Sequence, residues 1–206
     1  HGFTVDTGGK GANQAVACAR AGVKTIMVGA VGDDVFGKKL RTVLVNEGID
    51  VSHIASVATS TGCAVINVAT GHNKIVIDHG ANFAIEEDQI TQALDKARPG
   101  DILVTQFEIP RPLIVHALRL AKTKGMITIV NPAPACYELN DMGSQIDFLM
   151  PNETEYAAYM KSEPTLITSI KHLVITMGAD GVKYVHDGEV SVIPGRKVTA
   201  LDTTAA

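Results

Sequence analysis

The stretch TIMVGAVGDDVFGKKLRTVLVNEG, residues 25–48, contains one complete strand-to-helix unit. Its first part, 25–31, is a short apolar run typical of a buried strand, and 35–47 has the spacing of an amphipathic helix that Gly48 would end. The same alternation recurs along the chain, and short apolar runs with helical flanks are typical of a parallel sheet covered by helices. The sequence therefore predicts an α/β fold.

The same alternation of strands and helices continues on both sides of this stretch. We expect further helices at 12–21, 86–97 and 112–124, further strands at 101–106, 128–131, 146–150 and 173–177, and a hairpin at 182–193. Between 152 and 171, helix propensity is fair only over 153–161, and Pro164 would end a helix there. A second full helix is therefore not expected before the strand at 173.

One region breaks the alternation of strands and helices. Residues 61–70 and 73–78 alternate apolar and polar side chains around Gly71, which is the pattern of an antiparallel hairpin with one solvent-exposed face. The opening residues 3–6 are predicted to add a strand to this small sheet. A hairpin of this kind, inserted into an α/β chain, suggests a lid or an interface.

Composition excludes several classes of protein. With 206 residues, 46% of them hydrophobic, the chain is long enough for one large domain with a small appendage. A net charge of −4, the absence of tryptophan and the absence of a basic run argue against nucleic-acid binding. No apolar stretch reaches the roughly 20 residues of a membrane span, and the first residues lack the features of a signal peptide. We expect a cytoplasmic protein that binds neither nucleic acid nor membrane.

The cysteines and histidines show no pattern of a metal site or a disulfide. The three cysteines, Cys18, Cys63 and Cys136, lie far apart and form no Cys-x-x-Cys pair, and the histidines have no HExxH-like spacing. The simplest interpretation is buried free thiols in a reducing compartment. No cysteine or histidine is predicted to bind a metal.

A second informative stretch is GGKGANQ, residues 8–14, which joins a strand-like start to an alanine-rich helix. Glycine admits positive φ and lets a ligand approach the main chain, and the first turn of the helix offers unpaired N–H groups. Lys10 and Asn13 add the donors and acceptors that a hydroxyl-rich ligand requires. From these residues alone, a sugar-like ligand, a phosphate and a simple tight turn all remain open.

Two phosphate-binding motifs are matched only in part. Residues 32–39 have the G-x-x-x-x-G-K spacing of a P-loop, but Lys39 stands where a Mg²⁺-binding Ser or Thr is needed, and Asp33 and Asp34 would repel phosphate. The two aspartates more simply favour the N-terminus of the following helix through its dipole. The sequence also argues against a dinucleotide-binding motif, because Gln14 occupies the place of the third glycine.

Three polar segments come directly after predicted strands, where open α/β sheets bind their ligands. They are Gln106-Phe107-Glu108, Asn131-Pro132-Ala133-Pro134-Ala135 and Pro151-Asn152-Glu153-Thr154-Glu155. Each segment by itself is commonly a turn or a helix cap. Because the carboxyl ends of parallel strands share one edge of a sheet, we expect all three to open onto one functional edge.

Together these segments resemble the ribokinase-like, or PfkB, family of carbohydrate kinases. GGKGANQAVACARAG (8–22) is similar to the first signature of the family, and NPAPA (131–135), PNETE (151–155), ITMGADG (175–181) and LDTTAA (201–206) are similar to later landmarks in the same order. The GGKGANQ and NPAPA forms are typical of members that phosphorylate ribose. The resemblance implies a three-layer α/β sandwich: a core of 8–60 and 80–206 with a mostly parallel central sheet, and a small β-sheet lid of 1–7 and 61–79.

The resemblance also implies roles for individual residues. The sugar-binding residues would be Gly9, Lys10, Gly11, Asn13 and Glu108. The ATP-binding residues would be Asn152, Thr176, Gly178, Asp180 and Gly181. The lid would cover the sugar and form the interface of a homodimer.

The same resemblance implies two kinds of cation and an anion hole. Glu155 would hold Mg²⁺ through water, because Mg²⁺ keeps most of its own waters. Asp202 and Thr204 would bind a monovalent cation, typically K⁺. Ala205 and Ala206 would form part of the anion hole beside it.

The activity that the resemblance implies for the full-length protein is ATP-dependent phosphorylation of D-ribose at its 5-hydroxyl. In the family the last segment continues to Gly-Asp, whose aspartate is the catalytic base, so we expect that base just after Ala206 and none within this chain. The family's opening strand, with a sugar-binding Asp-x-Asn, is not recognised here either. Two alternatives remain: a kinase for another sugar or nucleoside, such as deoxyribose, and a non-catalytic sugar- or nucleotide-binding regulator.

Overall fold

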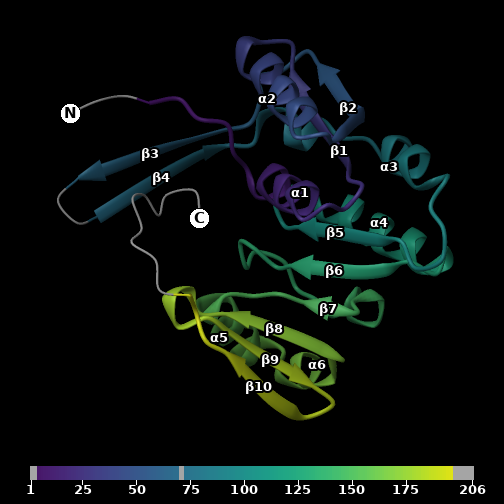
Figure 1. Ribbon diagram of the computed structural model, residues 1–206, viewed down its shortest axis with the longest axis vertical. Helices are drawn as coiled ribbons and strands as arrows, with labels where there is room; N and C mark the ends of the chain where they lie inside the picture. The colour runs from purple at the N-terminus through teal and green to yellow at the C-terminus, as the bar shows by residue number, and fades with distance from the viewer. Residues whose placement is uncertain (1–3, 70–71, 197–206) are drawn as a thin grey trace. The chain divides into compact units, whose positions relative to one another are not determined.

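The computed structural model describes residues 4–69 and 72–196 and divides the chain into two compact units (Figure 1). Unit 1 comprises the described residues up to Ala93 together with Glu108–Pro110. Unit 2 comprises Leu94–Phe107 and the described residues from Arg111 onward. The short segment Glu108–Pro110 therefore belongs by its contacts to the first unit, although the residues on both sides of it belong to the second.

Unit 1 contains two small sheets and the helices that accompany them. Its elements are α1 (Lys10–Arg20), β1 (Ile26–Gly32), α2 (Val35–Asn46), β2 (Asp50–Val57), β3 (Cys63–Ala69), β4 (His72–Asp78), the 3₁₀ helix η1 (Gly80–Ala84) and α3 (Glu87–Leu94). Strands β1 and β2 pair in parallel and are joined by helix α2, whereas β3 and β4 form an antiparallel hairpin. The predicted strand-to-helix unit and the predicted hairpin are both confirmed.

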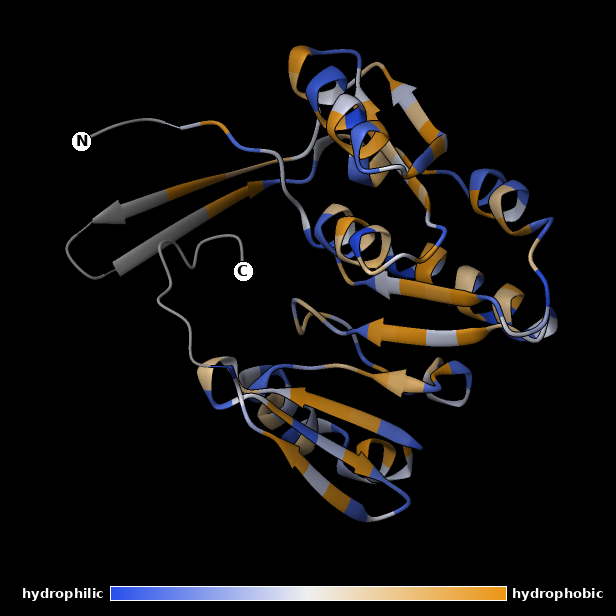
Figure 2. Ribbon diagram, viewed as in Figure 1, coloured by the Kyte–Doolittle hydropathy of each residue, from blue (hydrophilic) through white to orange (hydrophobic). Residues whose placement is uncertain are grey.

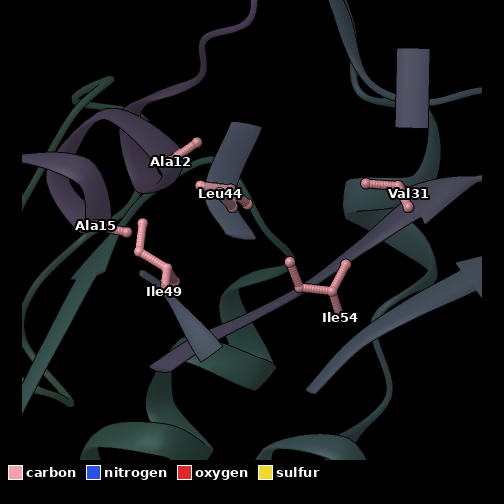
Figure 3. Packing of buried hydrophobic residues seen from close by; sticks show 6 residues of the cluster. All are labelled: Ala12, Ala15, Val31, Leu44, Ile49 and Ile54. Carbon is pink, nitrogen blue, oxygen red and sulfur yellow. The ribbon is translucent and has the colours of Figure 1, made fainter. Parts of the chain in front are cut away.

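The core of unit 1 is formed by α1, α2, β1 and β2 (Figure 3). Its buried side chains are Ala12, Ala15, Val31, Leu44, Ile49 and Ile54. Gly48 ends α2 with a φ of +76°, and this turn lets the Ile49 N–H bond the Leu44 carbonyl at 3.1 Å while the Ile49 side chain enters the core. Burying an aliphatic side chain such as Leu44 stabilises the fold by about 1.5–3 kcal/mol.

Unit 2 is built on a six-stranded sheet with the order β10-β9-β8-β7-β6-β5. The strands are β5 (Ile102–Gln106), β6 (Ile127–Asn131), β7 (Phe148–Leu149), β8 (His172–Thr176), β9 (Val182–His186) and β10 (Glu189–Ile193). The helices are α4 (Arg111–Thr123), η2 (Gly143–Gln145), α5 (Glu153–Ser162), α6 (Pro164–Ser169) and η3 (Gly178–Asp180). Strands β5 to β8 run parallel, and β9 and β10 extend the sheet antiparallel. Figure 2 shows β5, β6 and β8 as mostly hydrophobic, as expected for strands with buried faces.

The predicted α/β class is confirmed, and most differences from the prediction are local. Helix α6 occupies six residues where no further full helix was expected, because a proline is favourable at the first position of a helix. Helix α3 ends at Leu94, three residues earlier than predicted, ahead of the helix-breaking Pro99. Within the described part of the chain, no helix combines the length and the apolar character needed to cross a membrane.

Two predictions were wrong. Residues 4–6 are not a strand, and the Val5 carbonyl accepts a hydrogen bond from Nζ of Lys39 at 2.7 Å, a side chain rather than a neighbouring strand; residue 3 lies outside the described residues. The thiols are also not all buried. Cys63 is exposed because it opens the hairpin strand β3, and Cys136 is exposed in the loop after β6.

Aromatic rings stack across strands β7, β8 and β9 at the beginning of β8. The ring of His172 lies 4.2 Å from the ring of Phe148 and 4.4 Å from the ring of His186, between centroids and in nearly parallel planes. The hydroxyl of Tyr184 is hydrogen-bonded to Nδ1 of His172 at 2.7 Å. Withdrawal from water lowers the pKa of His172 below the ordinary value of a histidine, and the neighbouring His186 and Lys171 lower that pKa further.

The protein is expected to lose stability as the pH falls from about 7 to about 5, in part through His172. Because the pKa of His172 is lower in the folded chain than in the unfolded chain, the unfolded chain binds more protons in this window, and protonation favours unfolding. The replacement His172→Phe keeps a ring in the stack and removes the titrating group, so the free energy of unfolding should depend less steeply on pH. Urea denaturation at several pH values measures both slopes, and equal slopes would contradict the prediction.

Candidate active site

The glycine-rich stretch forms the turn that leads into helix α1. The helix begins at Lys10, and Gly9 precedes it with a φ of +98°, a backbone angle that residues with a Cβ rarely adopt. The carbonyl of Gly9 accepts a hydrogen bond from the Asn13 N–H at 2.9 Å. A Cβ atom at Gly9 would meet nothing within 4 Å, so the glycine is needed for its backbone angle, and the main chain beside it is open to a ligand.

The carboxylate of Glu108 lies at the N-terminus of α1, although it is 98 residues from Lys10 in the sequence. Its Oε2 accepts a hydrogen bond from the backbone N–H of Lys10 at 3.4 Å, and its Oε1 lies 3.9 Å from Nζ of Lys10. That N–H is one of the unpaired donors at the start of the helix, and a carboxylate there also interacts favourably with the helix dipole. The side chains of Lys10 and Glu108 are still 41% and 25% exposed, which leaves both accessible.

This arrangement in unit 1 suits a ligand with several hydroxyl groups. The Glu108 carboxylate can accept hydrogen bonds from hydroxyls, and the Lys10 ammonium and the exposed Asn13 amide supply donors. Gly11 lies in the same first helical turn. A phosphate would be repelled by the Glu108 carboxylate, so the turn is better suited to a sugar than to a phosphate.

A second group of predicted site residues lies in unit 2, at the start of helix α5. Oδ1 of Asn152 accepts a hydrogen bond from the Glu155 N–H at 2.8 Å, and Oε2 of Glu155 accepts one from the Asn152 N–H at 2.8 Å. This reciprocal pair is a capping box, which satisfies two N–H groups at a helix N-terminus. The N-x-x-E spacing therefore has a structural role in this chain in addition to any role in ligand binding.

The turn after strand β8 is joined to the start of α5. Thr176, the last residue of β8, donates its N–H to the Pro151 carbonyl at 3.0 Å and forms a parallel bridge with Asn152. The chain then turns through η3, and the Met177 N–H donates to the Gly181 carbonyl at 2.8 Å. Unit 2 thus brings together residues from two segments that were predicted to bind ATP: Asn152, Thr176, Gly178, Asp180 and Gly181.

Two glycines allow the η3 turn to lie close to the end of β10 and to the residues that follow it. Gly181 has a φ of +99°, and a Cβ atom there would collide with the carbonyl oxygen of Ile193. A Cβ atom at Gly195 would collide with the carbonyl oxygen of Ala179, inside the turn. The two backbone segments therefore approach more closely than side chains would permit. Gly195 was not among the predicted site residues, although Pro194 and Gly195 form a Pro-Gly pair, which indicates a turn.

The loops after neighbouring parallel strands meet at one edge of the unit 2 sheet. Asn131 ends β6, and its Nδ2 donates to the Met150 carbonyl, just after β7, at 2.8 Å. Phe107, just after β5, donates its N–H to the Ala133 carbonyl at 3.1 Å. The shared edge is therefore confirmed for these loops, whereas Glu108 belongs to unit 1.

Glu155 has the chemistry needed for an outer-sphere magnesium ligand. Mg²⁺ keeps several waters and is usually bound through one or two carboxylates together with phosphate oxygens of the substrate. The capping box uses Oε2 of Glu155, so that Oε1 remains for an ordered water. Within residues 4–69 and 72–196, no three His, Cys, Asp or Glu side chains gather as metal ligands. The other predicted ion-binding and anion-hole residues lie outside the described residues: Asp202, Thr204, Ala205 and Ala206.

Known proteins are similar to this chain in sequence and in fold. The family described as pfkB family carbohydrate kinase matches residues 1–206. A ribokinase of Haemophilus influenzae is 36% identical, over 99% of this chain and 71% of its own length. A deoxyribokinase of Salmonella typhi is 32% identical, over 99% of this chain and 72% of its own length. A structure of Arabidopsis thaliana ribokinase complexed with ribose and ATP is 25% identical, with a TM-score of 0.79 over 98% of this chain and 72% of that one.

Proposed function

The chain belongs to the pfkB family of carbohydrate kinases, and on this basis we propose that the full-length protein phosphorylates D-ribose at its 5-hydroxyl with ATP. Family membership makes the protein a sugar kinase that transfers a phosphoryl group to a hydroxyl. The observation that carries the choice of a sugar ligand is the approach of the Glu108 carboxylate to the Lys10 turn. The ribokinase of Haemophilus influenzae, at 36% identity, supports ribose as that sugar.

In this proposal, the turn at the start of α1 binds the sugar. Glu108 accepts hydrogen bonds from sugar hydroxyls, and Lys10 and Asn13 donate to the remaining ones. Gly9 and Gly11 let the sugar approach the main chain of the helix start. The contact between Glu108 and the Lys10 N–H orients the carboxylate before the sugar binds, which lowers the entropy lost on binding.

The residues gathered in unit 2 bind ATP in this proposal. The turn that runs from Thr176 through η3 to Gly181, with Gly178 and Asp180, would lie along the nucleotide, and Asn152 would lie near its phosphates. Glu155 holds water bound to Mg²⁺, and the ion neutralises charge on the phosphates. Asp202 and Thr204 bind a monovalent cation, K⁺, and Ala205 and Ala206 contribute to the anion hole.

The hairpin β3–β4 is proposed to be the lid of the sugar site and the interface of a homodimer. The proposed lid comprises 1–7 and 61–79, and the core comprises 8–60 and 80–206. Several apolar side chains of the hairpin are half exposed, with Val65 at 59%, Val76 at 58% and Ile77 at 50%. An apolar surface of this kind is typical of a contact with another chain.

Replacing Gly195 by valine is expected to displace the η3 turn and to raise KM for ATP about tenfold. The added side chain would collide with the Ala179 carbonyl and push the turn away from β10. Steady-state kinetics at saturating sugar measure the change. Ser191→Val, at an exposed position on β10, is the control and should leave KM for ATP unchanged. A variant Gly195→Val that melts earlier but retains the wild-type KM for ATP would show that the glycine is only structural.

The test of the proposed function is an assay of the full-length protein with ATP, Mg²⁺ and K⁺, and with ribose, deoxyribose or fructose as the acceptor. We expect the highest kcat/KM with ribose and a phosphate at the 5-position of the product. A higher kcat/KM with deoxyribose would favour the alternative supported by the deoxyribokinase of Salmonella typhi. Sugar binding without turnover of any acceptor would instead favour a non-catalytic regulator. Omitting K⁺ or Mg²⁺ tests the two proposed ions.

A further inference from the structure

The β3–β4 hairpin of unit 1 extends away from strands β1 and β2 (Figure 1). Two short segments connect it to the core, an incoming stem that includes Ser60 and Thr61 and an outgoing stem that includes Gly80 and Ala81. The incoming stem follows β2, and the outgoing stem follows Asp78 at the end of β4. The Ala81 N–H donates to the Ser60 carbonyl at 2.8 Å, which ties the stems together. Gly80, with a φ of +43°, has no room for a Cβ atom, because that atom would collide with the same carbonyl. The stems therefore leave the core as a pair.

The incoming stem is tied to Asp34 through Thr61. The Thr61 N–H donates to Oδ2 of Asp34 at 2.8 Å, and the Thr61 hydroxyl donates to Oδ1 at 2.7 Å. The same hydroxyl accepts a hydrogen bond from the Gly32 N–H, at the end of β1, at 3.0 Å. Thr61 is only 8% exposed. One buried threonine thus links the stem both to the end of a strand and to the start of helix α2.

Asp34 holds this position firmly because it is also the N-cap of α2. Its Oδ1 accepts a hydrogen bond from the Gly37 N–H at 2.8 Å. Hydrogen bonds from the Thr61 N–H, the Gly37 N–H and the Thr61 hydroxyl lower the pKa of Asp34 to about 2, so the carboxylate is ionised at neutral pH. A Cβ atom at Gly32 or Gly37 would collide with the backbone in this region, so the segments approach more closely here than side chains would permit.

We propose that Asp34 is a positioning residue that fixes the stem of the β3–β4 hairpin to strand β1 and helix α2, and thereby sets the KM for the sugar. The effect on KM rests on the proposed function, in which the hairpin closes over the sugar. A hairpin anchored at its stem loses less conformational freedom when it closes, and the sugar binds more tightly for that reason. The anchor contributes equally to the complex with sugar and to the transition state, so it affects KM and not kcat.

Two variants separate the anchor from the helix cap. Asp34→Ser keeps an oxygen that can accept the Gly37 N–H, but a single short hydroxyl cannot also accept both hydrogen bonds from Thr61. Thr61→Val removes the hydroxyl at nearly constant shape and leaves Asp34 in place. Thr61→Ser restores that hydroxyl. The matched control is Asp33→Asn, because Asp33 is 76% exposed at its side chain and pairs with Lys38 at 3.0 Å rather than with the hairpin stem.

The experiment combines steady-state kinetics with hydrogen exchange in the full-length protein. For Asp34→Ser and Thr61→Val we expect KM for the sugar to rise about tenfold with kcat within about twofold of wild type. Thr61→Ser and Asp33→Asn should remain close to wild type. In hydrogen exchange, peptides from β3 and β4 should exchange faster in Asp34→Ser and Thr61→Val, while peptides from α2 should not.

Each outcome decides one part of the proposal. Unchanged hydrogen exchange in the hairpin, or equal acceleration in hairpin and α2, would overturn the anchor and leave Asp34 only a helix cap. Faster exchange in the hairpin with an unchanged KM for the sugar would overturn the link to sugar binding. If the wild type phosphorylates no sugar, the proposed function fails, and the exchange measurement alone decides whether Asp34 anchors the hairpin.

Discussion

Replacing Glu155 by glutamine is expected to lower the kcat of the full-length kinase about 100-fold without unfolding it. Glutamine serves as well as glutamate at the third helical position of a capping box, so the hydrogen bond to the Asn152 N–H is kept. The charge is lost, and with it the carboxylate that we propose to hold water on Mg²⁺. The melting temperature should therefore move by less than about 2 °C.

The control for this prediction is Glu153→Gln, which removes a neighbouring carboxylate from the same helical turn. The change removes the same charge near the helix start as Glu155→Gln does. Because Glu153 is not proposed to hold Mg²⁺, kcat should stay within about twofold of wild type. A titration of Mg²⁺ at fixed ATP gives a second readout, and Glu155→Gln should need more of the ion to reach half of its maximal rate. A variant Glu155→Gln with wild-type kcat and wild-type Mg²⁺ requirement would assign Glu155 to the capping box alone.

Replacing Glu108 by alanine is expected to lower kcat/KM for the sugar by about 10²- to 10³-fold. The carboxylate would otherwise accept hydrogen bonds from sugar hydroxyls, and hydrogen bonds to a charged group are among the strongest in proteins. Truncation also leaves the Lys10 ammonium without its partner at 3.9 Å. KM for ATP should change little, because Glu108 is not among the residues that we propose to bind ATP.

Two further variants sharpen this test. Glu108→Gln retains an oxygen for the Lys10 N–H and should recover part of the lost kcat/KM, since it can still accept hydrogen bonds but carries no charge. Glu86→Gln removes an exposed carboxylate elsewhere in unit 1 and serves as the control. If Glu108→Ala lowers kcat/KM no more than Glu86→Gln does, the sugar does not bind at the start of α1.

Local patterns predicted the elements well where a single segment contains all of the relevant signals. The run 25–31, the spacing of 35–47 and Gly48 correspond to β1, α2 and the turn that ends α2. Hairpins were predicted from alternation and turn residues, and both are present. The strand expected at residues 3–6 is not formed by the described residues 4–6, because a strand needs a neighbouring strand to pair with, and the Val5 carbonyl is bonded by the Lys39 side chain instead.

In the candidate site, too, features that depend on nearby residues were predicted, whereas contacts between distant segments were not. The residue types at the start of α1 and of α5 were visible in the sequence, because capping and glycine-rich turns depend on neighbours within four residues. The role of Asp34 was predicted only in part: the dipole argument placed it at a helix start, whereas its hydrogen bonds to Thr61, 27 residues away, were not foreseen. The close approach of Gly195 to the η3 turn was missed for a similar reason.

The sequence by itself determined the class of fold, the order of strands and helices, and the segments that carry polar groups, because these depend on periodicity and on local backbone preferences. Only the tertiary structure decided which of those groups meet. Lys10 and Glu108 are 98 residues apart, and no local pattern in either segment encodes their contact. Such pairs form because packing of the apolar faces fixes the helix and the loop in space, and the polar groups at their ends are carried into place by that packing.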